Sequence, residues 1–160
     1  MTQSLLAGRK FIQVTMGKAR PDSMNGVSRM VHMLAETLCA GGYDVEVWGI
    51  TVESQKLVRR YPLHLFPTRT FRFSVDPQIA TKLGKLTGSD IVHFHGTMIP
   101  DFWAIARLAR KIGVPWIVTP HGALMPTALK RNGWVKRVYL NLFERGFLRN
   151  ACALHALCRP

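Results

Sequence analysis

The chain has 160 residues, the length of one domain, and its 22 lysines and arginines against 9 acidic residues give a net charge of +13 with histidine neutral. Apolar residues make up 48% of the chain, which excludes a disordered polymer, and no run of them reaches the roughly 18 residues needed to span a bilayer. The positive charge predicts a partner that carries phosphate, whether nucleic acid, anionic lipid or a nucleotide-linked substrate.

The first fifty residues predict a strand, a helix and a second strand. Residues 10–15 are mostly apolar or β-branched, as in a buried strand. A helix is expected to begin near residue 26, because apolar residues then recur every three or four positions, and Gly41 and Gly42 end it. Residues 44–51 return to a strand pattern, so this part of the chain is expected to form a βαβ unit.

The middle of the chain carries one weak pattern and one clear one. Residues 52–75 have no strong periodicity, and within them 63–67 are the expected short strand. Asp76 stands directly before a proline, which is typical of the start of a helix, and we expect that helix to run to about residue 86. Residues 90–95 then have the composition of a buried strand.

The last third continues the alternation of helices and strands. We expect a helix over 100–112, a strand over 116–119, a basic amphipathic helix over about 135–149 and a strand of small residues over 151–157. Strands that alternate with helices of this length indicate a doubly wound, mostly parallel, Rossmann-like α/β sheet with helices on both faces. We expect one such domain over residues 1–160.

Two of the expected strands end in histidine and glycine. The first contains His93 and ends at His95 and Gly96, and the second is followed by a proline and then His121 and Gly122. In open α/β sheets ligands bind beyond the carboxyl ends of the strands. We therefore expect His121 to contact the substrate, and the other four residues to support the loops around it.

Other chemistry is possible for the same histidines. His93 and His95 lie two residues apart and so share a face of their strand, and together with His121 they match the ligand set of a three-histidine zinc site. A histidine at a strand end more often bonds the next loop, so no metal and no cofactor are expected. A serine nucleophile is not expected either, because the chain has no G-x-S-x-G motif.

The start of the first long helix is the second candidate site. A helix N-terminus offers unpaired N–H groups and a partial positive charge, and a glycine there lets a phosphate approach the backbone. Asn25 and Gly26 stand at this position, although no G-x-G-x-x-G fingerprint is present. The simpler alternative is that these two residues only turn the chain.

The segment from residue 130 to 149 is basic and also rich in apolar side chains. Such a helix can lie on an anionic membrane surface, or it can pack on the core and expose an ordinary solvated basic face. Both interpretations stay open at this point. The cations expected to form the patch are Lys130, Arg131, Lys136, Arg137 and Arg145.

Several of these features, in this order and spacing, carry a resemblance to a known family. They are the Asn-Gly-Val start of the first long helix, its Ala-Gly-Gly-Tyr-Asp-Val end, the segment DIVHFHG at 90–96, the segment VTPHG at 118–122, and the basic helix leading into NACAL at 150–154. Together they cover nearly the whole chain. The sequence resembles the N-terminal domain of retaining glycosyltransferases of family four, which have the two-domain GT-B fold.

The resemblance implies roles for individual residues. In that family the glycine at the start of the first helix approaches the phosphates of the donor, and the histidine of the Pro-His-Gly loop lies near the transferred sugar. These roles carry over to Gly26 and His121. Asn25 stands where the family usually has a glycine, and Tyr43 where it usually has a histidine. A nucleotide sugar would be the co-substrate, without a metal, and a glycan or lipid-linked molecule the acceptor.

The resemblance also implies a second domain, because family members are about twice this length and hold most of the nucleotide sugar in a C-terminal domain. We therefore expect this chain to be a piece of a longer enzyme or half of a split one, and to be inactive alone. The expected setting is bacterial surface-glycan assembly. Because residues 1–10 lack an apolar signal core, we expect a cytoplasmic protein that can bind the inner face of the membrane peripherally.

A non-catalytic basic α/β module that binds a membrane surface or nucleic acid is the alternative function. The chain shows neither an aromatic and basic sheet motif nor a recognition-helix pattern. Nucleic acid is therefore not the expected partner.

Overall fold

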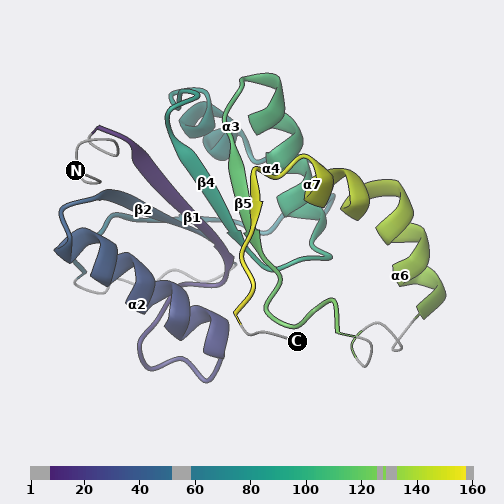
Figure 1. Ribbon diagram of the computed structural model, residues 1–160, viewed down its shortest axis with the longest axis horizontal. Coiled ribbons are helices and arrows are strands. Elements are labelled where there is room, and N and C mark those ends of the chain that lie inside the picture. Colours follow the sequence, from purple (N-terminus) through teal and green to yellow (C-terminus); the bar gives the residue numbers. More distant parts are fainter. Residues whose placement is uncertain (1–7, 52–58, 126–127, 129–132, 158–160) are drawn as a thin grey trace.

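The structure is a computed structural model that describes residues 8–51, 59–125, 128 and 133–157. In this part of the chain six strands form one sheet in the order β3-β2-β1-β4-β5-β6, and every neighbouring pair is parallel. Figure 1 shows the strands running side by side with their carboxyl ends at one edge. The strands are β1 (Lys10–Met16), β2 (Asp44–Ile50), β3 (Leu63–Phe66), β4 (Ile91–His95), β5 (Trp116–Thr119) and β6 (Ala153–Leu154).

Helices cover both faces of this sheet. The near face in Figure 1 carries α2 (Gly26–Ala40), which lies across β1 and β2, and the far face carries α3 (Pro77–Leu83) and α4 (Pro100–Lys111). Two apolar clusters match this division, since α2 contributes Val31 to one and α4 contributes Phe102 to the other. The predicted doubly wound, Rossmann-like parallel sheet is confirmed.

The order of the strands reverses between β1 and β4. From β1 the chain moves outward through β2 to β3, then returns to the other side of β1 and moves through β4 to β6. In the register Thr15 of β1 lies opposite His95 of β4, so the two strands end together. Such a reversal point is where open α/β sheets bind their ligands, beyond the carboxyl ends of the strands.

The helix α2 begins and ends as its sequence predicts. Oδ1 of Asn25 accepts a hydrogen bond from the backbone N–H of Val27 at 2.9 Å, which caps the first turn. At the other end Gly41 donates to the Thr37 carbonyl, and Gly42 has a φ of 82°, a conformation that favours glycine. This capping fixes the N-terminus of α2 beyond the carboxyl end of β1.

The basic helix predicted over 135–149 is not continuous. It consists of α6 (Gly133–Tyr139), a π-helical turn η1 (Leu140–Glu144) and α7 (Arg145–Arg149). The N–H of Arg145 donates to the carbonyl of Leu140, five residues earlier, which widens the turn. Beyond this turn Phe147 reaches the main apolar cluster, so tertiary packing decides a local feature that periodicity does not reveal.

Two other predicted elements are shorter in the structure. The strand predicted over 151–157 is confined to the two residues of β6, which pair with β5 at the open edge of the sheet and are exposed. The helix that starts after Asp76 ends at Leu83 rather than near residue 86, because Gly84 caps it and the chain turns. Neither change moves the carboxyl ends of the central strands.

A candidate active site at the carboxyl edge of the sheet

Histidines from two neighbouring strands meet on the near face of the sheet. His93 and His95 project from β4 toward the face that carries α2, while Val92 and Phe94 project toward the opposite cluster. The imidazole rings of His93 and His95 lie 4.1 Å apart between centroids, and those of His95 and His121 lie 5.5 Å apart. The predicted shared face of the two strand histidines is confirmed, and His121 lies next to them.

His95 lies at the centre of this cluster and has a partner on each ring nitrogen. Its Nε2 lies 2.7 Å from Oε1 of Gln13 on β1, and its Nδ1 lies 3.3 Å from Nε2 of His121. Gln13 and His95 are each only 2% exposed. Because water does not compete at these atoms, the three side chains are held in one arrangement.

A second row of hydrogen bonds lies beside the first. The hydroxyl oxygen of Thr119 on β5 lies 2.7 Å from Nε2 of His93 and 3.1 Å from Nδ1 of His155, which follows β6. Thr119 is fully buried, whereas His155 is exposed. The cluster therefore extends from the core to the surface of the near face.

Burial keeps these histidines neutral. It lowers the pKa of His93 to about 4 and the pKa of His95 well below its usual value of 6.5, and the neighbouring histidines lower both further. The pKa of His121 is lowered by the same two causes, burial first and then His155. Near neutral pH each ring consequently has one N–H donor and one bare nitrogen that accepts.

The loop after β5 holds His121 in an uncommon backbone conformation. His121 has a φ of 49° and Gly122 a φ of 78°, and the N–H of Ala123 closes the turn by donating to the carbonyl of Pro120. A non-glycine residue with positive φ costs conformational energy and is often found at functional sites. The turn brings the ring of His121 back against His95.

Gly96 makes room for the loop after β4. Its φ is 137°, and a Cβ placed there would lie 2.9 Å from Cδ1 of Ile99. Only glycine adopts this conformation without strain. Gly96 and Gly122 thus each allow the turn of their loop through a positive φ.

Asn25 and Gly26 also lie beyond the carboxyl ends of the strands, at the start of α2. Gly26 is exposed, and a Cβ on it would meet no atom within 4 Å. Among the described residues no hydrogen bond joins this pair to the histidines. The structure therefore presents two separate polar regions on one edge, a helix N-terminus beside β1 and a histidine cluster beside β4 and β5.

The histidines do not form a metal site. No group of three or more histidine, cysteine or acidic side chains in the described part of the chain is arranged to hold a metal ion. Nε2 of His93 is bonded to Thr119, and both ring nitrogens of His95 are bonded, to Gln13 and His121. Asp101, six residues after His95 in the sequence, is instead bonded to Arg72 at 2.7 Å.

Three residues of the cluster are absent from the sequence prediction: Gln13, Thr119 and His155. Gln13 could have been found, because it is a polar residue inside an apolar strand, and the register places it directly opposite His93. Thr119 has no such signal, because a β-branched threonine is common in any strand. His155 follows a two-residue strand whose pairing no local pattern reveals.

The predicted cationic patch is only partly described. Lys130 and Arg131 lie outside the described residues, and Lys136 donates to the backbone carbonyl of Ala128, whereas Arg137 and Arg145 are exposed. The apolar side chains of the segment divide, because Tyr139 and Phe143 pack on Phe73 while another set is exposed. The exposed set, here called the α6 strip, is Trp134, Val135, Val138 and Leu142.

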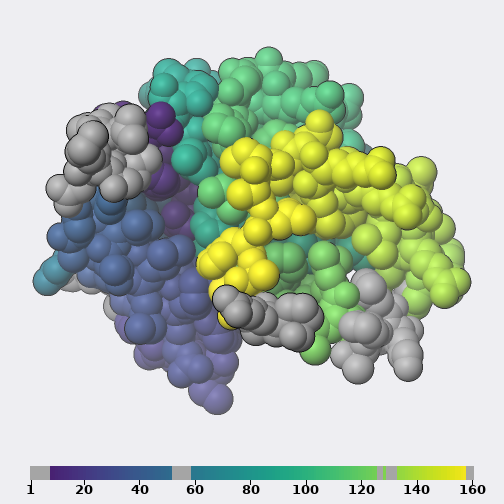
Figure 2. All heavy atoms as spheres, in the orientation of Figure 1, coloured from purple at the N-terminus to yellow at the C-terminus, as the bar shows by residue number. Residues whose placement is uncertain are grey.

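The α6 strip belongs to one end of the molecule, where α6 and η1 protrude in the space-filling view of Figure 2. Exposed fractions of 76% for Trp134 and 67% for Leu142 are large for apolar side chains of this size. No helix in the described part of the chain is both long and apolar enough to cross a membrane.

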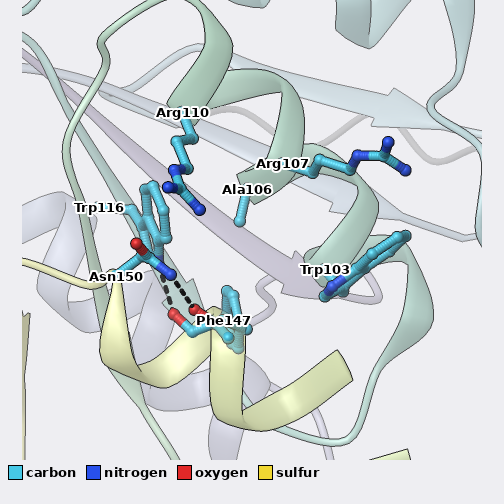
Figure 3. A pocket seen from close by; sticks show the side chains of 8 residues that line it. Trp103, Ala106, Arg107, Arg110, Trp116, Phe147 and Asn150 are labelled. Atoms are coloured by element: carbon cyan, nitrogen blue, oxygen red, sulfur yellow. Dashed lines mark hydrogen bonds between the residues drawn. The ribbon is translucent and has the colours of Figure 1, made fainter. Parts of the chain in front are cut away.

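A hollow between α4 and α7 lies on the other side of the sheet. It has a volume of about 220 Å³ and is lined by Trp103, Trp116 and Phe147, with Arg107 and Arg110 at its border. Figure 3 shows Arg110 beside the indole of Trp116, above α7. Since Trp116 and Phe147 belong to the cluster opposite the histidines, this hollow is separate from the carboxyl-edge site.

The fold defines a class of protein, a Rossmann-like α/β domain, and in this chain polar residues gather at the carboxyl ends of the strands. Residues 25–160 match the family described as the glycosyl transferase 4-like domain. The chain belongs to this family, which confirms the resemblance to the N-terminal domain of family-four glycosyltransferases.

Other comparisons are less informative. No curated protein matches the sequence. Among solved structures, the chain is similar to the crystal structure of S. aureus homoserine dehydrogenase at pH 7.0, with 14% identity and a TM-score of 0.41. The match covers 94% of this chain but 32% of the dehydrogenase, so the chain spans about a third of that protein. At this level of similarity the match carries no argument about function.

Proposed function

We propose that this chain is the acceptor-side domain of a retaining glycosyltransferase, which moves a sugar from a nucleotide-sugar donor to a polysaccharide or glycolipid acceptor in bacterial surface-glycan assembly. One observation carries the proposal: His121 is held at the carboxyl edge of the sheet by a 3.3 Å contact with buried His95. Its Nδ1 has no partner among the described residues. A fixed, neutral imidazole with one vacant nitrogen suits contact with an uncharged sugar.

The N-terminus of α2 is the proposed site for the phosphates of the donor. Gly26 is exposed and unobstructed, so a phosphate oxygen can reach the backbone N–H groups of the first turn. Asn25 uses Oδ1 to cap the helix, which leaves its Nδ2 group for a phosphate. The departing pyrophosphate would be stabilised there by N–H donors, the helix dipole and the net charge of +13.

Transfer also requires that the sugar be held in one orientation. A buried network that keeps His121 in place supplies this, because a site that is ordered before the ligand arrives loses little entropy on binding. In the two-domain enzymes that the chain resembles, the second domain holds the nucleotide. The proposal is therefore that Gly26 and His121 contribute one side of a shared site.

The α6 strip supports a peripheral membrane role for the same enzyme. Its apolar side chains are flanked by the exposed cations Arg137 and Arg145, a combination that favours the interface of an anionic bilayer. A lipid-linked acceptor would then be met at the membrane surface. The alternative of a non-catalytic membrane-binding module uses the α6 strip but gives no role to the histidine cluster.

The experiment that tests the proposal is a transfer assay. Sugar transfer from UDP-, GDP- and ADP-sugars to lipid-linked acceptors would be measured with the 160-residue chain, alone and with the C-terminal domain of a family-four glycosyltransferase added. We expect turnover in the mixture. His121→Ala should reduce it roughly 100-fold, the effect of removing one oriented polar group from an active site.

His64→Ala, on β3 and away from the histidine cluster, is the matched control and should keep full activity. Equal turnover in His121→Ala and in the control would contradict the assigned site. Membrane binding by a mixture that shows no turnover with any donor would favour the non-catalytic module.

A further inference from the structure

Three side chains from three different segments form a chain of hydrogen bonds that ends at the proposed sugar site. Gln13 comes from β1, His95 from β4 and His121 from the loop after β5. Oε1 of Gln13 lies 2.7 Å from Nε2 of His95, and Nδ1 of His95 lies 3.3 Å from Nε2 of His121. Each link joins two atoms of which one must carry a proton.

The direction of the protons is determined by the first link. A carbonyl oxygen only accepts, so Nε2 of His95 must carry the proton. In a neutral imidazole the other nitrogen is then bare, and Nδ1 of His95 accepts from Nε2 of His121. By the same rule Nδ1 of His121 carries no proton.

We propose that Gln13 is a positioning residue that acts through His95 to fix the tautomer of His121, so that His121 presents a bare Nδ1 that accepts a hydrogen bond from a hydroxyl of the transferred sugar. The ligand in this statement rests on the proposed function. The tautomers rest only on the contacts within the chain.

Burial and the neighbouring ring of His93 hold the chain of hydrogen bonds in one state. Gln13 and His95 are both 2% exposed, so water cannot satisfy either nitrogen of His95 in place of its partners. The ring of His93 lies 4.1 Å from that of His95 and is itself bonded to Thr119, which restricts rotation of the His95 ring. The titratable groups that face His95 and His121 are His93 and His155, and burial with mutual repulsion lowers the pKa of both His95 and His121.

A bare Nδ1 selects the chemistry of its ligand. It accepts from a hydroxyl, whereas a phosphate oxygen, which is also an acceptor, would face it without a proton between them. The helix N-terminus at Gly26 has the opposite preference, because its N–H groups only donate. The edge of the sheet would therefore receive phosphate beside β1 and a sugar hydroxyl beside β5, which fixes the direction in which a nucleotide sugar lies.

The tautomers can be measured directly in the free protein. Long-range ¹H–¹⁵N spectra of the ¹⁵N-histidine-labelled 160-residue chain at pH 7.5 distinguish a protonated from a bare ring nitrogen. We expect protonated Nε2 and bare Nδ1 in both His95 and His121. A proton on Nδ1 of either residue, or an averaged mixture, would overturn the proposal.

Substitutions at Gln13 test its role in the chain of hydrogen bonds. Gln13→Glu keeps an oxygen that only accepts, so both tautomers should persist and the pKa of His95 should rise beside the carboxylate. Gln13→Leu removes the acceptor, and His121 should then show a mixture of tautomers. Gln78→Leu, the same change at an exposed position on α3, is the matched control and should leave His121 unchanged.

If Gln13→Leu does not fold, the wild-type and Gln13→Glu spectra still decide the question. A Gln13→Glu spectrum with a proton on Nδ1 of His95 would overturn the role of Gln13. Addition of UDP-glucose, GDP-mannose or ADP-glucose to the wild type separates the two proposals. If the tautomers are as expected but the signals of His121 do not shift with any donor, the sugar site is refuted and the hydrogen-bond chain is supported.

Discussion

Ionisable side chains are buried on both sides of β4, but they differ in how completely they are hydrogen-bonded. On the near side His93 and His95 each have hydrogen-bond partners. On the far side Phe94 packs on aromatic rings, and the carboxylate of Glu144 is buried at 1% exposure with Oε1 unpartnered in the described chain. Burial shifts the pKa of the ionisable groups on both sides, downward for the histidines and upward for Glu144, so the two sides should make stability depend on pH in opposite directions.

Glu144 is a buried carboxylate with one unpartnered oxygen, Oε1, among the described residues. Burial raises its pKa to about 7, although a backbone hydrogen bond at Met98 opposes the shift. The hydroxyls of Thr97 and Tyr139 are likewise buried without partners in the described residues. Glu144 is the last residue of the π-helical turn, so the widened turn places this carboxylate inside the molecule.

The largest expected effect is on the apolar side of β4. Phe94→Ala should lower the free energy of unfolding by about 3 to 5 kcal/mol, because Phe94 contacts Phe102 and Phe147 and the cavity would not close. His93→Ala, one residue away on the polar side, should cost about 1 kcal/mol, since Thr119 keeps His155 as a partner. Urea unfolding of both variants measures the difference, and a larger loss for His93→Ala would reverse the comparison.

The second expected effect concerns the pH dependence caused by Glu144. Its pKa is about 7 in the folded chain and 4.5 as a free side chain, so folding favours the protonated form. The stabilisation is complete below pH 4.5 and is lost as pH rises through 7, by about 3 kcal/mol at most. Glu144→Gln should remove this loss and be more stable than wild type at pH 8, as measured by thermal unfolding at several pH values.

Glu36→Gln, the same change on α2 and away from Glu144, is the control for the series. A Glu144→Gln protein with the wild-type profile from pH 4.5 to 8 would mean that Glu144 is not the titrating group.

The third expected effect has the opposite sign of pH dependence. His93 has a pKa of about 4 when folded and 6.5 when free, so folding favours its neutral form. This stabilisation is present above pH 6.5 and is lost as pH falls toward 4. The loss is about 2 kcal/mol at pH 5. In His93→Gln the free energy of unfolding, measured with urea, should fall less between pH 6.5 and 4 than in the wild type. The same fall in both proteins would contradict the assignment.

The smallest expected effect is at the α6 strip, where apolar side chains are exposed instead of buried. Arg137→Glu and Arg145→Glu should each weaken binding to vesicles with anionic lipid by about 1 kcal/mol or more at low salt. Liposome sedimentation measures this, with Arg29→Glu on α2 as the control. Equal binding to neutral and anionic vesicles, or none to either, would remove the membrane role.

The sequence predicted most of the sheet because its signals are local. Periodic apolar residues and the glycines after α2 located that helix, and short apolar runs ending in polar residues located β4 and β5. Since parallel strands share a carboxyl edge, the runs ending at His95 and His121 also predicted where the candidate site lies. These predictions needed no knowledge of which strands are neighbours.

The features that the sequence did not predict depend on pairing across the sheet. Gln13 becomes part of the site only because β1 lies beside β4, and Thr119 only because its hydroxyl reaches two histidines from other segments. The π-helical turn and the burial of Glu144 result from packing on the core. Interactions between residues 26 or more positions apart, such as His95 with His121, have no local signature.

The central claim is that the carboxyl edge, and not the hollow between α4 and α7, binds a nucleotide sugar. Backbone and histidine NMR spectra recorded during titration with UDP-, GDP- and ADP-sugars test it most directly. We expect shifts at Gly26, Gly96 and His121 with at least one donor, at affinities of about 1 mM. Shifts at Arg107 and Arg110 with none at the edge residues would contradict the account.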